Sequence, residues 1–192
     1  MPTGEELLPE RLPGPRGLLL RRWLPEDALV LSDAVAESRE HLRPWMAWVA
    51  GEPSTLEQRR SMLIGFERDW LAGGDVVLGM FLDGRVVGGC GLHRRIACDG
   101  LELGYWVHPH FTRRGLATTA ARLLTDTALR LPRITHVEIH HDKANVASAG
   151  VPRRLGFRLL AEMPDEIETP GEIGIECQWR MDQEQWARSA LR

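Results

Sequence analysis

Apolar residues along the chain follow two spacings, every second position in some segments and every third or fourth in others. Short apolar runs typical of strands occupy residues 17–23, 76–82, 86–92, 101–107, 134–140, 157–162 and 173–181. Helical spacing marks residues 28–37, 54–71, 112–130 and 145–155. Their order predicts an α/β chain of the mixed α+β kind, with a mixed, mostly antiparallel central sheet and helices on both faces.

Local signals support several of these boundaries. Pro25, followed by two acidic residues, suits the first turn of a helix. Ser54 and Glu57 have the spacing of a capping box, and Asp83-Gly84 between two strands indicates a hairpin turn. We therefore divide the chain into a flexible N-terminal leader (1–16), one domain (17–182) and a C-terminal tail (183–192).

Composition narrows the class of protein. The chain has 192 residues, of which 43% are hydrophobic and 27% charged, as expected for one soluble globular domain. A net charge of −3 argues against a nucleic-acid partner, because such a surface needs a concentrated positive face. Three cysteines without Cys-x-x-Cys spacing indicate neither a disulfide framework nor a zinc knuckle. With no apolar signal core and no run near the length of a membrane span, we expect a cytoplasmic protein with no membrane partner.

The strand at 101–107 and the helix after it contain the stretch that carries the chemistry. Pro109 ends the strand, because proline cannot donate a ladder hydrogen bond. Residues 111–117 then turn into an alanine-rich helix, whose first backbone N–H groups have no partner within the helix. The aligned peptide dipoles leave about half a positive charge at this end, so the turn suits a phosphate group.

This turn and two later motifs resemble the GCN5-related N-acetyltransferase (GNAT) superfamily. Residues 112–117, Thr-Arg-Arg-Gly-Leu-Ala, fit the family's pyrophosphate loop Gln/Arg-x-x-Gly-x-Gly/Ala, with threonine as the first residue. Residues 145–148, Asn-Val-Ala-Ser, and 155–157, Leu-Gly-Phe, resemble the motifs of the family's fourth helix. With Glu-Leu-Gly-Tyr-Trp at 102–106, the chain looks like the branch that includes the ribosomal-protein N-terminal acetyltransferases.

The resemblance implies where a cofactor would bind. In the family's fold the fourth and fifth strands, here 101–107 and 134–140, splay apart, and the pantetheine arm of acetyl-CoA enters the gap as an extra strand would. Backbone N–H groups and arginines of the loop would hold the phosphates. The predicted cofactor-binding residues are Trp106, Val107, Thr112, Arg113, Arg114, Gly115, Leu116, Ala117, Thr118 and Asn145.

The resemblance also implies the reaction, which is transfer of acetyl from acetyl-CoA to a primary amine by direct attack in a ternary complex. We predict a protein or peptide N-terminal α-amine as the acceptor. A small-molecule amine, such as an antibiotic or polyamine, and a non-catalytic acyl-CoA-binding module are the alternatives. The sequence leaves open the length of the acyl group and the oligomeric state, for which a homodimer is one option.

Two residues are candidates for proton transfer. Ser148 matches a serine that the ribosomal-protein branch places near the thioester sulfur, where a hydroxyl could protonate the leaving thiolate; an ordinary helical serine is the alternative. Many relatives carry a tyrosine four residues later, where Pro152 stands here and should distort the helix. Glu102, the single charge in its strand, is the candidate base, and a structural pairing with an arginine is the alternative.

Three residues are candidates for the acceptor site. Residues 162–172 hold five acids and no base, so Glu166 and its neighbours would attract a cationic amine unless the loop is merely solvated. Trp45 and Trp48 would form an aromatic wall, or else pack in the core. We predict no metal site, because neighbouring strand residues such as His140 and His141 point to opposite sides.

Overall fold

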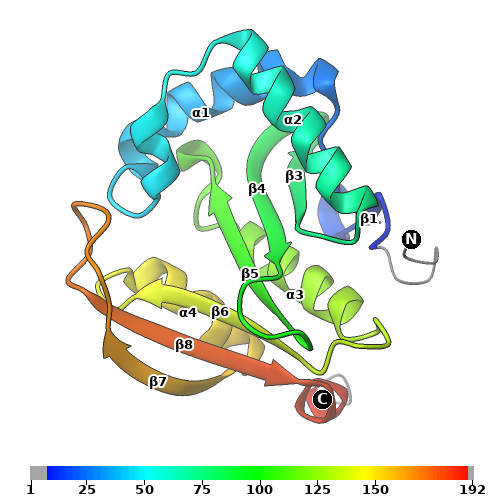
Figure 1. Cartoon of the computed structure of the whole chain (residues 1–192), viewed down its shortest axis with the longest axis vertical. Helices are drawn as coiled ribbons and strands as arrows, with labels where there is room; N and C mark the ends of the chain where they lie inside the picture. Colours follow the sequence, from blue (N-terminus) through cyan, green and yellow to red (C-terminus); the bar gives the residue numbers. More distant parts are fainter. Residues whose placement is uncertain (1–7, 190–192) are drawn as a thin grey trace.

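One eight-stranded sheet runs through residues 8–189, the part of the chain that this computed structural model describes. The strands are β1 (Arg11–Pro13), β2 (Leu18–Arg22), β3 (Val76–Leu82), β4 (Arg85–His93), β5 (Gly100–Val107), β6 (His136–Asp142), β7 (Arg158–Pro164) and β8 (Ile175–Asp182). Their order across the sheet is β1-β2-β3-β4-β5-β6-β8-β7, and each neighbouring pair is antiparallel except β5 and β6. The predicted mixed, mostly antiparallel sheet is confirmed (Figure 1).

The α-helices of the described residues cover both faces of this sheet. They are α1 (Ala28–Leu42), α2 (Leu56–Leu71), α3 (Leu116–Ala128), α4 (Val146–Leu155) and α5 (Gln183–Ser189). α1 and α2 pack over β3 and β4 on one face, whereas α3 and α4 lie against β5 and β6 on the other (Figure 1). Between residues 8 and 189, the chain forms no helix with the length and apolar character needed to cross a membrane.

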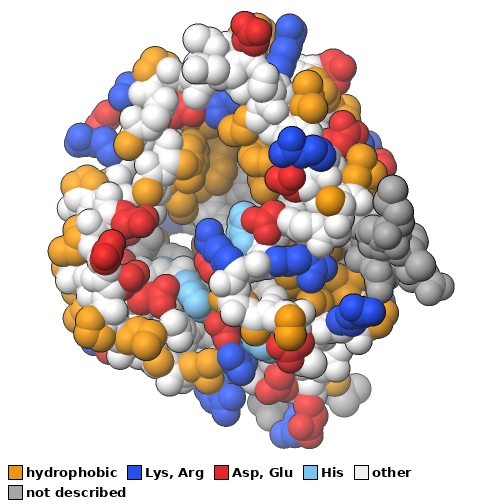
Figure 2. All heavy atoms as spheres, viewed as in Figure 1, with side chains coloured by type: hydrophobic (Ala, Val, Ile, Leu, Met, Phe, Trp, Pro, Cys, Tyr) orange, Lys and Arg blue, Asp and Glu red, His pale blue; other side chains and the backbone are white. Residues whose placement is uncertain are grey.

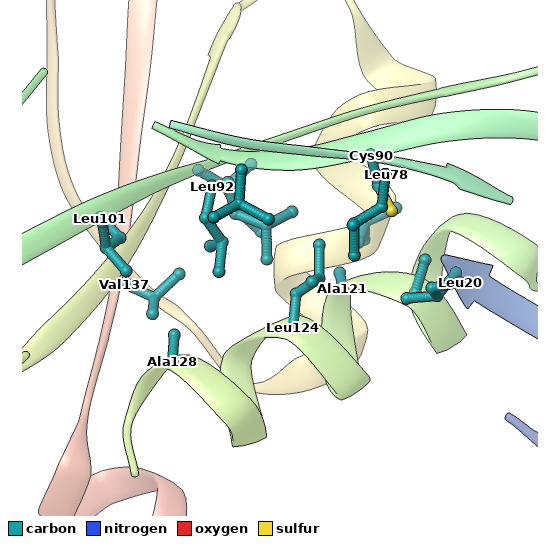
Figure 3. Close-up of a cluster of buried hydrophobic side chains, with 14 of the residues drawn as sticks. Leu20, Leu78, Cys90, Leu92, Leu101, Ala121, Leu124, Ala128 and Val137 are labelled. Atoms are coloured by element: carbon teal, nitrogen blue, oxygen red, sulfur yellow. The ribbon is translucent and has the colours of Figure 1, made fainter. Parts of the chain in front are cut away.

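A face of small apolar residues holds α3 close to the sheet. Ala121, Leu124 and Ala128 are fully buried and point toward strand residues such as Leu92 and Leu101 (Figure 3). Alanine brings the helix backbone close because its side chain ends at Cβ, and burying each leucine contributes about 1.5–3 kcal/mol. The packing therefore fixes the position of α3 relative to β5, the strand that precedes it.

The parallel pairing between β5 and β6 is short. It joins Gly100 to His136, Leu101 to Val137 and Glu102 to Glu138, and the paired register then ends although both strands continue. Beyond Glu102 the edge of β5 that faces β6 therefore lacks a strand partner in the described fold. This opening lies between the two strands that the family resemblance predicted to splay apart, 101–107 and 134–140.

Two helix boundaries differ from the predicted ones for local reasons. α1 extends to Leu42 rather than residue 37, because Ser38 and Leu42 continue its buried face. The capping box of α2 lies one residue later than predicted, with Thr55 as N-cap. The Gln58 N–H donates to Thr55 Oγ1 at 3.2 Å, whereas the Ser54 hydroxyl donates to the Glu52 carboxylate.

Parts of the predicted leader and tail belong to the folded body. β1 pairs with β2, and Leu8 is only 4% exposed within the main core cluster. At the other end, α5 buries Trp186, whose indole N–H donates to Asp126. The prediction of a flexible leader is therefore wrong for residues 8–16, and the prediction of a separate tail is wrong for residues 183–189. Residues 1–7 and 190–192 lie outside the described residues.

Asp142, the last residue of β6, fastens the chain that leads into β8. Its Oδ2 accepts the N–H groups of Ile173, Gly174 and Ile175 at 3.0, 2.9 and 3.2 Å, and its Oδ1 accepts that of Ala144 at 2.7 Å. Burial raises the pKa of this carboxyl, but the backbone hydrogen bonds outweigh burial and hold the pKa below its usual 3.8. The ionised carboxylate is thus bound more tightly than the neutral acid.

Replacing the Asp142 carboxylate should change how the thermal stability of the protein depends on pH. A group with a lowered pKa contributes stability above its unfolded pKa, 3.8, and loses that contribution as the pH falls through the folded value. We expect Asp142→Asn to lower Tm by roughly 3–6 °C at pH 7 and by progressively less as the pH falls below 3.8. Thermal unfolding of both proteins across this range checks it, and a difference independent of pH would contradict the role of the charge.

Candidate active site

Two cavities of opposite charge adjoin the opening between β5 and β6. The first, which we call the acidic cavity, has two arginines, Arg59 and Arg95, and the carboxylates of Glu52, Glu102, Asp142, Asp165, Glu166, Glu172 and Glu176. The second, the basic groove, is lined by Arg16, Arg113, Arg114 and Arg154, and by no Asp or Glu of the described residues. Figure 2 shows acidic side chains gathered beside the central hollow of the molecule.

The two cavities meet at a small set of side chains. Those that line both are Trp45, Met46, Tyr105, Trp106, Asn145 and Ser148. Tyr105 and Trp106 come from the end of β5 that is paired with β4 but not with β6. Asn145 and Ser148 come from the start of α4. A molecule in the groove and another in the cavity would therefore come into contact at this junction.

The loop before α3 is shaped to bind an anion. Arg113 and Gly115 both have left-handed backbone, with φ of 62° and 76°, so α3 begins only at Leu116 and not at residue 112 as predicted. Successive N–H groups around left-handed residues form a concave anion site, and the first turn of α3 adds further unpaired N–H groups. A Cβ at Gly115 would meet nothing within 4 Å, so the loop faces open space.

All ten residues predicted to bind a cofactor line the basic groove. Some of them make structural contacts as well. Asn145 Oδ1 accepts the Ser148 N–H at 3.0 Å and caps α4. The Thr112 hydroxyl donates to the Pro109 carbonyl at 3.0 Å and so braces the loop.

Ser148 has a partner that the sequence did not predict, the hydroxyl of Tyr105. The Tyr105 oxygen lies 3.0 Å from Ser148 Oγ and 3.1 Å from the Ser148 carbonyl oxygen. In a regular helix that carbonyl would accept the N–H four residues on, but Pro152 has none to donate. α4 continues through Pro152 to Leu155, so the proline leaves the helix intact and frees the carbonyl that Tyr105 binds.

Burial controls the protonation of Tyr105. It raises the pKa of the phenol to about 12, and the hydrogen bond to Ser148 opposes the rise. Tyr105 is therefore neutral at pH 7 and available as a donor. It is the one tyrosine in the sequence and part of the motif at 102–106, but nothing in the sequence indicated its contact with Ser148.

Glu102 lies where the β5–β6 pairing ends, and its carboxylate is already engaged. Arg95 donates to both oxygens, from Nε at 2.7 Å and from Nη2 at 2.5 Å. This is the structural arginine pairing that the sequence left as the alternative. To accept a proton from a substrate, Glu102 would have to loosen this ion pair.

Beside Glu102, three residues of β6 and β8 form a hydrogen-bonded group. His140 Nε2 lies 2.7 Å from Glu138 and His140 Nδ1 lies 3.2 Å from Glu176. Burial raises the pKa of Glu138, but hydrogen bonds from His140 and Arg180 outweigh it and hold the pKa below its usual range. Glu138 and His140 share one face of β6, and His140 lines the acidic cavity.

The predicted acceptor residues also line the acidic cavity. Trp45 and Trp48 do so from the segment after α1, and the Trp48 ring lies 6.3 Å from that of Trp106. The acidic loop is tied to the same segment, because the Thr169 hydroxyl donates to the Pro44 carbonyl at 2.6 Å. The aromatic and acidic walls are thus fastened together, and Glu166 lies in the acidic one.

One group of possible metal ligands occurs among residues 8–189, away from both cavities. Ligand atoms of Glu37, His108 and His110 lie within 4.8 Å of one another. Both nitrogens of His108 are engaged, since Nε2 lies 3.0 Å from Glu37 and Nδ1 accepts the His110 N–H at 3.3 Å. A metal on Nε2 would need a proton on Nδ1, where that N–H already points, so the geometry suits a hydrogen-bonded histidine.

Comparison with known proteins places this geometry in a family. The family model described as "Acetyltransferase (GNAT) domain" matches residues 17–158. YdaF of Bacillus subtilis (strain 168), named as a candidate ribosomal N-acetyltransferase, is 26% identical over 141 residues, which are 73% of this chain and 77% of YdaF.

Solved structures show the same fold. RimL, a ribosomal L7/L12 alpha-N-protein acetyltransferase in complex with coenzyme A, has a TM-score of 0.83 at 20% identity over 92% of this chain and 99% of its own. The microcin C7 self-immunity acetyltransferase MccE, in complex with acetyl-CoA and AMP, has a TM-score of 0.79 at 18% identity over 88% and 97%. The family match, the shared fold and the loop before α3 agree, and the chain belongs to the GNAT acetyltransferase family.

Proposed function

We propose that the protein transfers acetyl from acetyl-CoA to a cationic primary amine, with both substrates bound at once. The observation that carries this proposal is the pair of oppositely charged cavities that meet at Tyr105 and Ser148. An anionic donor in the groove and a cationic acceptor in the cavity would each be attracted to its own side. Direct attack then needs only that the amine and the thioester meet at the junction.

The basic groove suits coenzyme A for three reasons. Its arginines are not balanced by described acids, its loop offers backbone N–H groups, and it leads to the unpaired edge of β5. Each charge-assisted hydrogen bond to a phosphate contributes about 1.5–3 kcal/mol. The amide groups of the pantetheine arm would pair with the free edge of β5, and N–H groups near Trp106 and Val107 would stabilise the oxyanion.

Ser148 would donate a hydrogen bond to the sulfur as the C–S bond breaks and the C–N bond forms. Tyr105 would position Ser148 by donating its one proton to the Ser148 carbonyl oxygen at 3.1 Å, which leaves the Ser148 hydroxyl free to turn toward the sulfur. A thiol has a pKa of about 8.5, well below that of Tyr105, so the phenol keeps its proton and acts as a positioning residue. The Ser148 hydroxyl would stabilise the leaving thiolate through its hydrogen bond to the sulfur.

The amine must lose a proton before or during attack. We assign this step to Glu102 and Glu176, the carboxylates beside His140 that line the acidic cavity, and Glu102 would first have to loosen its ion pair with Arg95. Both ring nitrogens of His140 already face carboxylates, so neither is free to accept the proton. His140 would instead hold Glu138 and Glu176 in place.

For the acceptor we propose a peptide or protein α-amine. The name of YdaF, a candidate ribosomal N-acetyltransferase, and that of RimL, a ribosomal L7/L12 alpha-N-protein acetyltransferase, support this choice. A small-molecule amine is the second candidate, supported by the likeness to MccE, which is named for self-immunity to microcin C7.

Turnover over an amine panel tests the reaction. Acetyl-CoA consumption, read as free thiol, should require an amine and should yield the N-acetyl product. Because Asp165 and Glu166 line the acidic cavity, neutralising both, Asp165→Asn with Glu166→Gln, should raise KM for the amine about 3–10-fold and leave kcat nearly unchanged. Glu168→Gln is the matched control, since Glu168 is in the same loop but does not line the cavity.

Salt should reproduce the effect of the double substitution. At about 0.5 M the Debye length falls to roughly 4 Å, so the wild-type KM should rise while that of the double variant hardly moves. Equal salt responses would mean that the loop does not attract the acceptor. Thiol release without an amine would indicate hydrolysis instead of transfer.

The anion loop is tested at Gly115. Because a Cβ there has room, Gly115→Ala should fold and lose affinity for coenzyme A only through the left-handed strain of about 1–2 kcal/mol. Gly115→Glu adds a negative charge facing the phosphates and should weaken binding at least 100-fold more than Gly115→Ala. Calorimetric titration measures both, and equal affinities would remove the loop from the coenzyme site.

The role of Tyr105 is tested by a double-mutant cycle with Ser148. Tyr105→Phe should lower kcat about 10–100-fold and Ser148→Ala roughly 10–10³-fold, with little change in KM for acetyl-CoA. If Tyr105 acts through Ser148, the double variant should be no slower than Ser148→Ala alone. Independent, multiplying effects would mean that Tyr105 does not work by orienting Ser148.

A further inference from the structure

The inner end of the acidic cavity is apolar. Two residues one helical turn apart on α1, Leu31 and Val35, face two on α2, Met62 and Phe66, and Val77 of β3 lies below them. All five belong to, or pack against, the smaller of the two core clusters. Figure 2 shows hydrophobic side chains lining the inner wall of the hollow.

The acidic cavity extends to these side chains. Protein interiors are packed with few voids larger than a water molecule. Here the whole cavity is about 680 Å³, within the range of roughly 300–1,000 Å³ that small-molecule sites occupy. Leu31 and Val35 are only 5% and 2% exposed, so the open surface at the apolar end belongs to Met62, Phe66 and Val77, which are half-buried.

The charged groups at this end cancel each other. Arg59 is 3% exposed and its Nη2 lies 2.5 Å from Glu52 Oε1, so the pair is internally neutral. The acids of the cavity that have no arginine partner among the described residues lie at the end of β6, in the acidic loop and on β8: Asp142, Asp165, Glu166, Glu172 and Glu176. The cavity thus has an acidic side and an apolar side.

We propose that the acceptor is an amphipathic amine, with a cationic nitrogen at the acidic side and a large apolar group that inserts between α1 and α2. This rests on the proposed function and adds the substrate class. A peptide fits if a bulky apolar side chain follows its α-amine closely, and a small amine fits if it carries an alkyl or aryl body. Small polar amines would leave the apolar walls in contact with water.

A homologous series of n-alkylamines tests the proposal, because its members share one charge and differ only in apolar length. From ethylamine to hexylamine, kcat/KM should rise by about fourfold per methylene and then level off when the space is filled. Calorimetric binding of the same amines to the protein saturated with coenzyme A should follow the same series. This second readout needs no turnover.

Substitutions inside the cavity should change the long amines alone. Val77→Phe fills the apolar end and should lower kcat/KM for hexylamine at least 10-fold while ethylamine is unaffected. Phe66→Ala enlarges the apolar end, so kcat/KM should level off at a longer alkyl chain. This variant still tests the proposal if Val77→Phe fails to fold. Val30→Phe is the matched control, because Val30 is 47% exposed on the outer face of α1.

The outcomes separate the two proposals. Length-dependent binding without acetylation would support the apolar site and overturn the proposed reaction. Acetylation and binding that are indifferent to chain length, or a Val77→Phe effect equal for ethylamine and hexylamine, would overturn the apolar site and leave the reaction standing.

Discussion

The early end of the β5–β6 pairing is the constraint on which the rest of the site depends. After Glu102 and Glu138 the two strands no longer share hydrogen bonds, yet buried backbone N–H and C=O groups cannot stay unpaired without cost. The alanine face of α3 packs against the sheet and fixes the position of β5 relative to the helix. The opening is therefore a stable part of the fold that only a ligand or water can satisfy.

The elements around this opening could largely be predicted from the sequence, because their signals are local. Strand periodicity located β3 to β6, and the Asp83-Gly84 turn has the left-handed backbone of a tight hairpin, with φ of 49° and 78°. The loop before α3 was recognisable from a short motif for the same reason. β1 and α5 were missed because a three-residue strand and a seven-residue helix carry too little periodicity and are stabilised by partners far away in the chain.

The contacts within the site could not be predicted, since they join distant segments. Arg95 meets Glu102 across a turn, and Tyr105 meets Ser148 across 43 residues. Pro152 shows the limit most clearly. In the sequence, this proline predicts a distorted helix and stands where many relatives carry a tyrosine hydroxyl. In the fold, α4 continues through it, and the Ser148 carbonyl that it leaves free accepts the hydroxyl of Tyr105 from β5. Proline at position 152 thus takes a side-chain donor out of α4, and it also leaves free the backbone acceptor that binds the Tyr105 hydroxyl.

The net charge of the chain conceals how its charges are arranged. A value of −3 argues against binding a polyanion, and yet arginines gather in a groove that no described acid lines. The acids gather in the other cavity, and the sheet lies between most of the two sets. Because low-dielectric protein screens charges far less than water does, each cavity keeps a field of its own sign. An anion and a cation would thus be guided to different sides of the sheet and meet only at the junction, where Tyr105 and Ser148 stand. In the proposed reaction, this separation would let one small domain attract two oppositely charged substrates, each to its own cavity.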